Sequence, residues 1–141
     1  MKTVDELASA GPLPAAAGIL VLVVDDETAV RRFAARVLER EGYAVVEARD
    51  GIEALELLAK GTIAVEVVVS DIVMPRLNGV ELVQTLATSY PDLPVILMSG
   101  YASSALAELG IAAPCAILPK PFPSERLLEE VRRCSGQRGR T

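Results

Sequence analysis

The most informative absence in this chain of 141 residues is histidine, of which it has none. That absence excludes a histidine base, most zinc sites and any phosphorylatable histidine within the chain. Cysteine is also scarce. Cys115 and Cys134 fit neither the spacing of a metal site nor a secreted disulfide framework, so a reducing cytoplasm is the expected location.

Long apolar runs and excess positive charge are absent too. The longest apolar run, Ala15–Val24, spans ten residues, whereas a membrane span needs about 20. Asp5 and Glu6 stand where a signal peptide would carry basic residues. The net charge of −5 argues against a nucleic-acid partner. With 51% hydrophobic residues, the chain suits one domain with its own core.

Strand and helix patterns alternate along the chain. Continuous β-branched runs predict strands that are buried on both faces, and apolar residues at helical spacing predict helices between them. The predicted strands are Ile19–Val24, Tyr43–Ala48, Val65–Val69, Pro94–Met98 and Cys115–Leu118, and the predicted helices are Thr28–Glu41, Gly51–Lys60, Val80–Tyr90, Ser103–Leu109 and Ser124–Arg133. Five strands and five helices in this order predict an α/β fold with a doubly wound parallel sheet.

The boundaries follow from composition. Residues 1–17, rich in Ala, Gly and Pro, are interpreted as a flexible leader or linker, 18–134 as the domain and 135–141 as a polar tail. In the first helix, Thr28 is the expected N-cap, Gly42 the expected stop, and Phe33 belongs to the apolar stripe.

Charged and hydroxyl side chains follow four of the predicted strands. Asp25 and Asp26 come after the first strand, Asp71 after the third, Ser99 after the fourth and Lys120 after the fifth. In doubly wound folds the site lies outside the carboxyl ends of the strands, so these side chains should converge. Crowded carboxylates repel one another and favour a hard divalent cation such as Mg²⁺. A carboxylate can also act as a nucleophile and form an aspartyl phosphate.

Taken singly, each of these residues has an ordinary explanation. An aspartate at a strand end is usually a turn former or a helix cap, and Glu27 is best read as a solvated charge in the first helical turn. The functional interpretation depends on four separate strand ends supplying oxygens or a cation at one rim.

Four motifs resemble those of response-regulator receiver domains, the phosphoacceptor modules of two-component signalling. They are VLVVDDE, SDIVMPRLNG, VILMSGY and ILPKPF, which occur in the order and spacing of that family between about Ile19 and Arg133. The resemblance implies a flavodoxin-like sheet with strand order 2-1-3-4-5. It also marks Lys120-Pro121 as a candidate cis peptide bond.

The resemblance assigns a role to each site residue. Asp71 would be the phosphoacceptor. Asp26, the Asp71 carboxylate and the Val73 backbone carbonyl would bind Mg²⁺ (or Mn²⁺) directly, and Asp25 would act through water. Ser99 would hydrogen-bond a phosphoryl oxygen, and Lys120 would pair with Asp71 or its phosphate.

The partner implied by the resemblance is a sensor histidine kinase or a histidine phosphotransfer protein. An isolated receiver is not itself an enzyme, and it acts in the cytoplasm without a membrane or nucleic acid. The residues of these motifs suit either a single-domain regulator or the C-terminal receiver of a hybrid sensor histidine kinase. A weak homodimer is left open. One departure concerns output: Ile117 stands where many receivers have a switching Tyr or Phe.

Three rival functions fit the residues less well. An aspartate-nucleophile phosphatase would carry Asp-x-Asp after the first strand together with a substrate cap, whereas this chain has Asp-Asp-Glu and no long insertion. A flavin or nucleotide site would need a Gly-rich or hydroxyl-rich loop there, and carboxylates would repel its phosphate. A pseudo-receiver would lack Asp71 or Lys120, and both are present.

Overall fold

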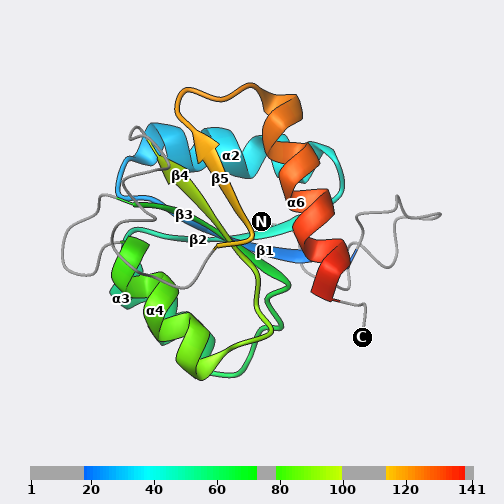
Figure 1. Cartoon of the computed structure of the whole chain (residues 1–141). Coiled ribbons are helices and arrows are strands. Elements are labelled where there is room, and N and C mark those ends of the chain that lie inside the picture. Colours follow the sequence, from blue (N-terminus) through cyan, green and yellow to red (C-terminus); the bar gives the residue numbers. More distant parts are fainter. Residues whose placement is uncertain (1–17, 73–78, 100–113, 139–141) are drawn as a thin grey trace.

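The computed structural model describes residues 18–72, 79–99 and 114–138. A five-stranded sheet runs through its centre, with helices on both faces (Figure 1). The elements are β1 (Leu20–Val24), α2 (Thr28–Arg40), β2 (Ala44–Ala48), α3 (Gly51–Ala59), β3 (Val67–Asp71), α4 (Gly79–Ser89), β4 (Val95–Ser99), β5 (Ala116–Pro119) and α6 (Ser124–Arg138). All five predicted strands and four of the predicted helices are confirmed, and the predicted helix Ser103–Leu109 lies outside the described residues.

The strand order is β2-β1-β3-β4-β5 with every pair parallel, as predicted. Since β1 and β3 are neighbours, the chain reverses its winding direction between them. Such a switch point opens a crevice outside the carboxyl ends of the two strands. The topology therefore fixes where a site is to be expected.

Alternation along each strand divides the core into two layers. On β1, Val21 and Val23 pack towards α2 and α6, whereas Leu22 and Val24 pack towards α3 and α4. The same alternation continues on β3 and β4, so the inner strands are apolar on both faces, as parallel strands covered by helices must be. Among the described residues, no helix has the length and hydropathy needed to cross a membrane.

Helix α2 begins at Thr28 and stops before Gly42 as predicted, but its N-cap and its apolar stripe differ from the prediction. Its N-cap is Glu27, in extended conformation, and Thr28 is the first helical residue. The Glu27 side chain makes no capping hydrogen bond, and the Glu27 amide donates to Asp25 Oδ1 at 2.8 Å. Phe33 is not in the core: it is 44% exposed and its ring lies 6.1 Å from that of Phe122. Gly42 stops the helix with a φ of 98°, a conformation that glycine adopts easily.

Helix α6 is longer than predicted, because it continues past Arg133 to Arg138. Cys134 extends the buried stripe of Leu127 and Val131 by one further turn and is completely buried. The polar residues around Cys134 predict a tail, whereas this turn is helical and Cys134 packs in the same core layer as Leu127 and Val131.

Candidate functional site

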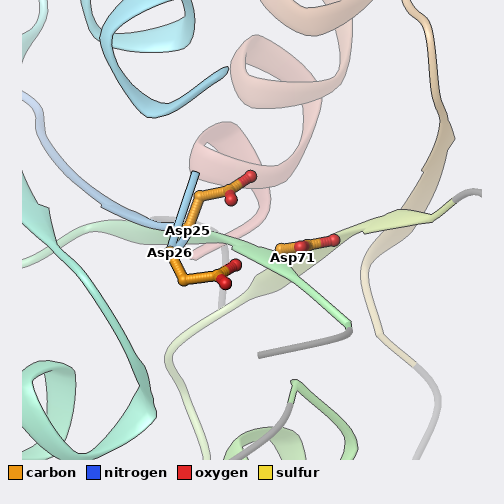
Figure 2. Close-up of side chains that lie close together, drawn as sticks. All are labelled: Asp25, Asp26 and Asp71. Atoms are coloured by element: carbon orange, nitrogen blue, oxygen red, sulfur yellow. The ribbon is translucent and has the colours of Figure 1, made fainter. Parts of the chain in front are cut away.

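The carboxyl ends of β1 and β3 bring the three aspartates together. β1 leads directly into Asp25 and Asp26, and β3 ends in Asp71. Because Val24 pairs with Ser70 in the parallel register, Asp25 and Asp71 follow at the same level of the sheet. Figure 2 shows the three side chains gathered beside these two strand ends.

On the other side of β3, the ends of β4 and β5 complete the rim. Ser99 pairs with Pro119, and the Lys120 amide donates to the Ser99 carbonyl at 2.8 Å. Ser99 is buried, with 1% of its surface exposed. The Lys120-Pro121 bond is cis, as the sequence suggested. Val73, the remaining predicted metal ligand, lies outside the described residues.

The three carboxylates form a compact cluster. One oxygen from each of Asp25, Asp26 and Asp71 lies within 4.8 Å of the other two. Their exposure differs: Asp25 is buried, Asp71 is partly exposed and Asp26 is exposed. The cluster therefore opens towards solvent at Asp26 and Asp71 and is closed behind Asp25.

Lys120 supplies a positive charge beside two of these carboxylates. Its Nζ lies 3.2 Å from Asp71 Oδ1 and 3.3 Å from Asp25 Oδ2. Burial by itself would lower the pKa of Lys120, but the neighbouring carboxylates outweigh burial and raise that pKa above its usual value. Lys120 consequently remains a cation across the physiological pH range.

Asp25 already has a partner on each carboxylate oxygen. Oδ1 accepts a hydrogen bond from the Glu27 amide at 2.8 Å, and Oδ2 faces Lys120. Burial is the largest influence and raises the pKa of Asp25; the charge of Asp71 adds to this increase, while the Glu27 amide and Lys120 oppose it. Any cation that enters the cluster would relieve this unfavourable environment.

Asp71 combines fixed geometry with access. Its Oδ1 accepts from the Ile72 amide at 2.9 Å and faces Lys120, and its side chain is 13% exposed. The Ser70 hydroxyl donates to the Asp71 carbonyl at 2.9 Å, which fixes the end of β3. Asp71 is thus the carboxylate that is both held in place and open to an incoming group.

Arg31 is a site neighbour that the sequence interpretation missed. It is buried, its Nη1 donates to the Asp25 carbonyl at 2.9 Å, and its Nε pairs with Glu47 Oε1 at 2.9 Å. These contacts tie α2 and β2 to the end of β1. The spacing of Arg31 does indicate burial, because it lies three residues before Ala34 and seven before Leu38, on the buried face of α2.

The donor set fits a hard divalent cation. Three carboxylates offer oxygen ligands, and Mg²⁺ is usually held by one or two protein carboxylates with water completing its shell. The described part of the chain has no buried side-chain nitrogen or oxygen without a hydrogen-bond partner. Because the three carboxylates and Lys120 lie together, the arrangement can hold a metal ion, keep Lys120 beside it, and present Asp71 as a nucleophile.

Comparison with known proteins gives a consistent result. The family model for the response regulator receiver domain matches residues 21–132. Sensor kinase CckA of Brucella abortus is 43% identical over 113 residues, which is 79% of this chain and 12% of that protein. Response regulator MprA of Mycobacterium sp. (strain KMS) is 40% identical over 115 residues, covering 81% of this chain and 49% of that protein. The chain spans at most about half the length of these curated relatives.

Solved structures agree with the sequence matches. The receiver domain from the hybrid histidine kinase CckA has a TM-score of 0.67 and 34% identity, and the match covers 82% of this chain and 98% of that one. A CheY-like receiver domain protein from Methanospirillum hungatei JF-1 has a TM-score of 0.76 and 28% identity. The match covers 86% of this chain and 96% of that one. TrrA of Thermotoga maritima, solved in complex with Mg²⁺ and BeF, has a TM-score of 0.71 and 29% identity. The match covers 82% of this chain and 98% of that one.

Proposed function

This chain belongs to the response regulator receiver domain family of two-component signalling, and on that premise we propose that Asp71 accepts a phosphoryl group from the phosphohistidine of a partner protein, with Mg²⁺ bound. In that step an Asp71 oxygen forms a bond to phosphorus while the phosphorus–nitrogen bond of the partner's histidine breaks. The electron pair stays on the imidazole, which takes a proton from solvent. The histidine lies outside these 141 residues, which contain none.

The observation that carries the proposal is the position of Lys120 between two carboxylates at the rim. Its Nζ lies within 3.3 Å of both Asp25 and Asp71, and Asp26 adds a third carboxylate on the solvent side. A cation beside an accessible carboxylate favours build-up of negative charge on an incoming phosphoryl group. An arrangement of this kind suits phosphoryl transfer better than a purely structural ion pair, because Asp71 keeps access to solvent.

The site residues have distinct proposed roles in this step. Bound Mg²⁺ would neutralise phosphoryl oxygens and the carboxylates around them. Asp26, Asp71 and the Val73 carbonyl are the proposed direct ligands, with Mn²⁺ an alternative ion. Both Asp25 oxygens already have protein partners, which supports contact through water. Ser99 would donate its hydroxyl to a phosphoryl oxygen, and Lys120 would pair with the phosphorylated Asp71.

The expected partner is a sensor histidine kinase or a histidine phosphotransfer protein in the cytoplasm, with no membrane or nucleic acid involved. The chain would act as a signalling module and not as an enzyme in its own right. The similarity to a hybrid kinase receiver and to response regulators supports both settings, a domain of a hybrid kinase and a stand-alone regulator.

Labelling with a small phosphodonor tests the proposal. Incubation with Mg²⁺ and acetyl phosphate should add one phosphoryl group that hydroxylamine removes, as an acyl phosphate requires. Asp71→Asn should abolish labelling because it removes the nucleophilic carboxylate. Asp92→Asn, a matched change of an exposed aspartate in the loop before β4, should label as the wild type does. Equal, hydroxylamine-sensitive labelling of the Asp71 variant would place the acceptor elsewhere.

A further inference from the structure

Cys115 and Cys134 lie together and form a disulfide, although they are separated by 19 residues in the chain. Their Cα atoms are 6.1 Å apart, a separation common to disulfide-linked residues. The spacing in the sequence gave no reason to expect this pair, because the contact depends on α6 folding back along β5. The proposed phosphoryl-transfer chemistry makes no use of either sulfur.

The pair connects the edge of the sheet to the last described helix. Cys115 directly precedes β5, the edge strand, and Cys134 lies in the second half of α6. Figure 1 shows α6 running beside β5, and contacts between the two elements confirm it. The acidic cluster lies at the other end of β5, where Lys120 follows the strand. The disulfide and the cluster are thus at opposite ends of the same strand.

The two sulfurs have unequal surroundings. Cys134 is completely buried in the core layer that contains Leu127 and Val131, whereas Cys115 is only partly buried. A thiolate that attacks a disulfide needs access to one sulfur. Cys115 therefore offers the point of attack, and Cys134 is the thiol that attack would release into the core.

Contacts other than the disulfide also join α6 to the sheet. Arg133 Nη2 donates to the Cys115 carbonyl at 2.9 Å and to Glu130 Oε2 at 3.1 Å. Leu127 and Val131 are fully buried against the sheet. These contacts need no disulfide, so the fold should persist with both cysteines reduced.

We propose that Cys115 and Cys134 are a reversible thiol–disulfide site that fastens α6 to the start of β5 when oxidised. The oxidant is a low-molecular-weight disulfide of the glutathione type. One protein thiolate attacks it and forms a mixed disulfide, and the other then displaces the second small thiol. The two protein thiols lose two electrons and two protons, and the small disulfide becomes two thiols. A small thiol in excess reverses both steps.

The consequence falls on α6 and leaves the acidic cluster unchanged. The crosslink closes a loop that contains β5, the Lys120-Pro121 turn and the first part of α6. Closing such a loop restricts the unfolded chain and the freedom of α6 to separate from β5. Oxidation would therefore restrict the movement of α6 relative to β5. The site does not depend on phosphorylation of Asp71.

Redox titration of the full chain tests the proposal. The protein is equilibrated in glutathione buffers of graded ratio, quenched with acid, denatured and alkylated. We expect two alkylated cysteines at the reducing limit and none at the oxidising limit, with peptide mapping that links Cys115 to Cys134 in one chain. The reduced protein should stay folded, with a Tm lower by about 10 °C, given the length of the closed loop. Hydrogen exchange of residues 124–138 should be faster in the reduced form.

Two variants separate the crosslink from side effects on packing. Cys115→Ser changes the partly buried partner and should remove the redox dependence of Tm without opening the core. Cys134→Ala should also remove the redox dependence of Tm, and it should lower Tm in both reducing and oxidising buffers. Two alkylated cysteines at the oxidising limit, a crosslink between chains, or unfolding on reduction would each overturn the proposal. Acetyl phosphate labelling should be equal in both redox states; absence of labelling in both would contradict the proposed function and leave the thiol–disulfide site intact.

Discussion

Replacing Lys120 with glutamine removes the cation that separates two carboxylates. Its Nζ lies 3.2 Å from Asp71 and 3.3 Å from Asp25, and Asp25 has no exposed surface on its side chain. Glutamine keeps much of the side-chain stem but not the charge. The change leaves two close carboxylates with a backbone amide each but no neighbouring cation, so the folded state without metal should lose stability.

The size of the loss follows from the geometry. Coulomb's law gives about 5 kcal/mol for each ion pair at this separation with an effective dielectric constant of about 20. Desolvation offsets much of that attraction, and removing one partner of a buried pair costs about 3–5 kcal/mol. Because 24% of the Lys120 side chain is exposed, solvent screening brings the cost to the lower limit of this range or below it. We expect a loss of about 2–3 kcal/mol, or roughly 6–10 °C in Tm for a domain of this size.

Thermal or urea unfolding with and without Mg²⁺ measures this effect. A bound metal ion would neutralise the same carboxylates, so saturating Mg²⁺ should reduce the deficit of Lys120→Gln to less than half of its metal-free value. Lys60→Gln is the matched control, because Lys60 is exposed at the end of α3; its effect should stay within about 0.5 kcal/mol in both buffers.

Two results would refute the reasoning. A deficit that Mg²⁺ leaves unchanged would mean that the metal binds away from the carboxylates that Lys120 faces. No deficit in metal-free buffer would mean that the two ion pairs contribute nothing net to folding. Either result can be obtained without any phosphorylation assay.

Two further changes test other parts of the site. Asp26→Ala should raise the metal-free Tm, by relieving repulsion within the cluster, and should abolish the rise in Tm caused by Mg²⁺; an unchanged metal response would place the cation elsewhere. Arg31→Met should cost about 2 kcal/mol in urea unfolding, because it leaves the Asp25 carbonyl and Glu47 without their buried donor. A loss below about 0.5 kcal/mol would show that the two acceptors find other partners.

The sheet was predictable because its strands are buried on both faces. Val21–Val24 and Val67–Val69 are unbroken apolar runs, and the helices between successive strands favour parallel pairing. Once the strands are parallel, the residues that follow them must share one rim. The sequence alone therefore places Asp25, Asp71 and Lys120 near one another.

Contacts between distant elements were not predictable from local patterns. The Cys115–Cys134 pair depends on how α6 lies against β5, and a separation of 19 residues carries no such information. Phe33 fits the apolar stripe by spacing, yet its ring ends up beside Phe122 at the surface. Arg31 interrupts the apolar stripe, but its acceptors, on Asp25 just after β1 and on Glu47 of β2, are brought to it only by the fold.

Locating the phosphoryl group tests the claim that Asp71 is the acceptor most directly. Borohydride reduces an acyl phosphate to an alcohol, which converts a phosphorylated aspartate to homoserine. After treatment with Mg²⁺ and acetyl phosphate, peptide mapping should find homoserine at Asp71 and at neither Asp25 nor Asp26. Omitting the phosphodonor should leave all three aspartates intact. Homoserine at Asp25 or Asp26, or a phosphoryl group retained without homoserine at Asp71, would contradict the account.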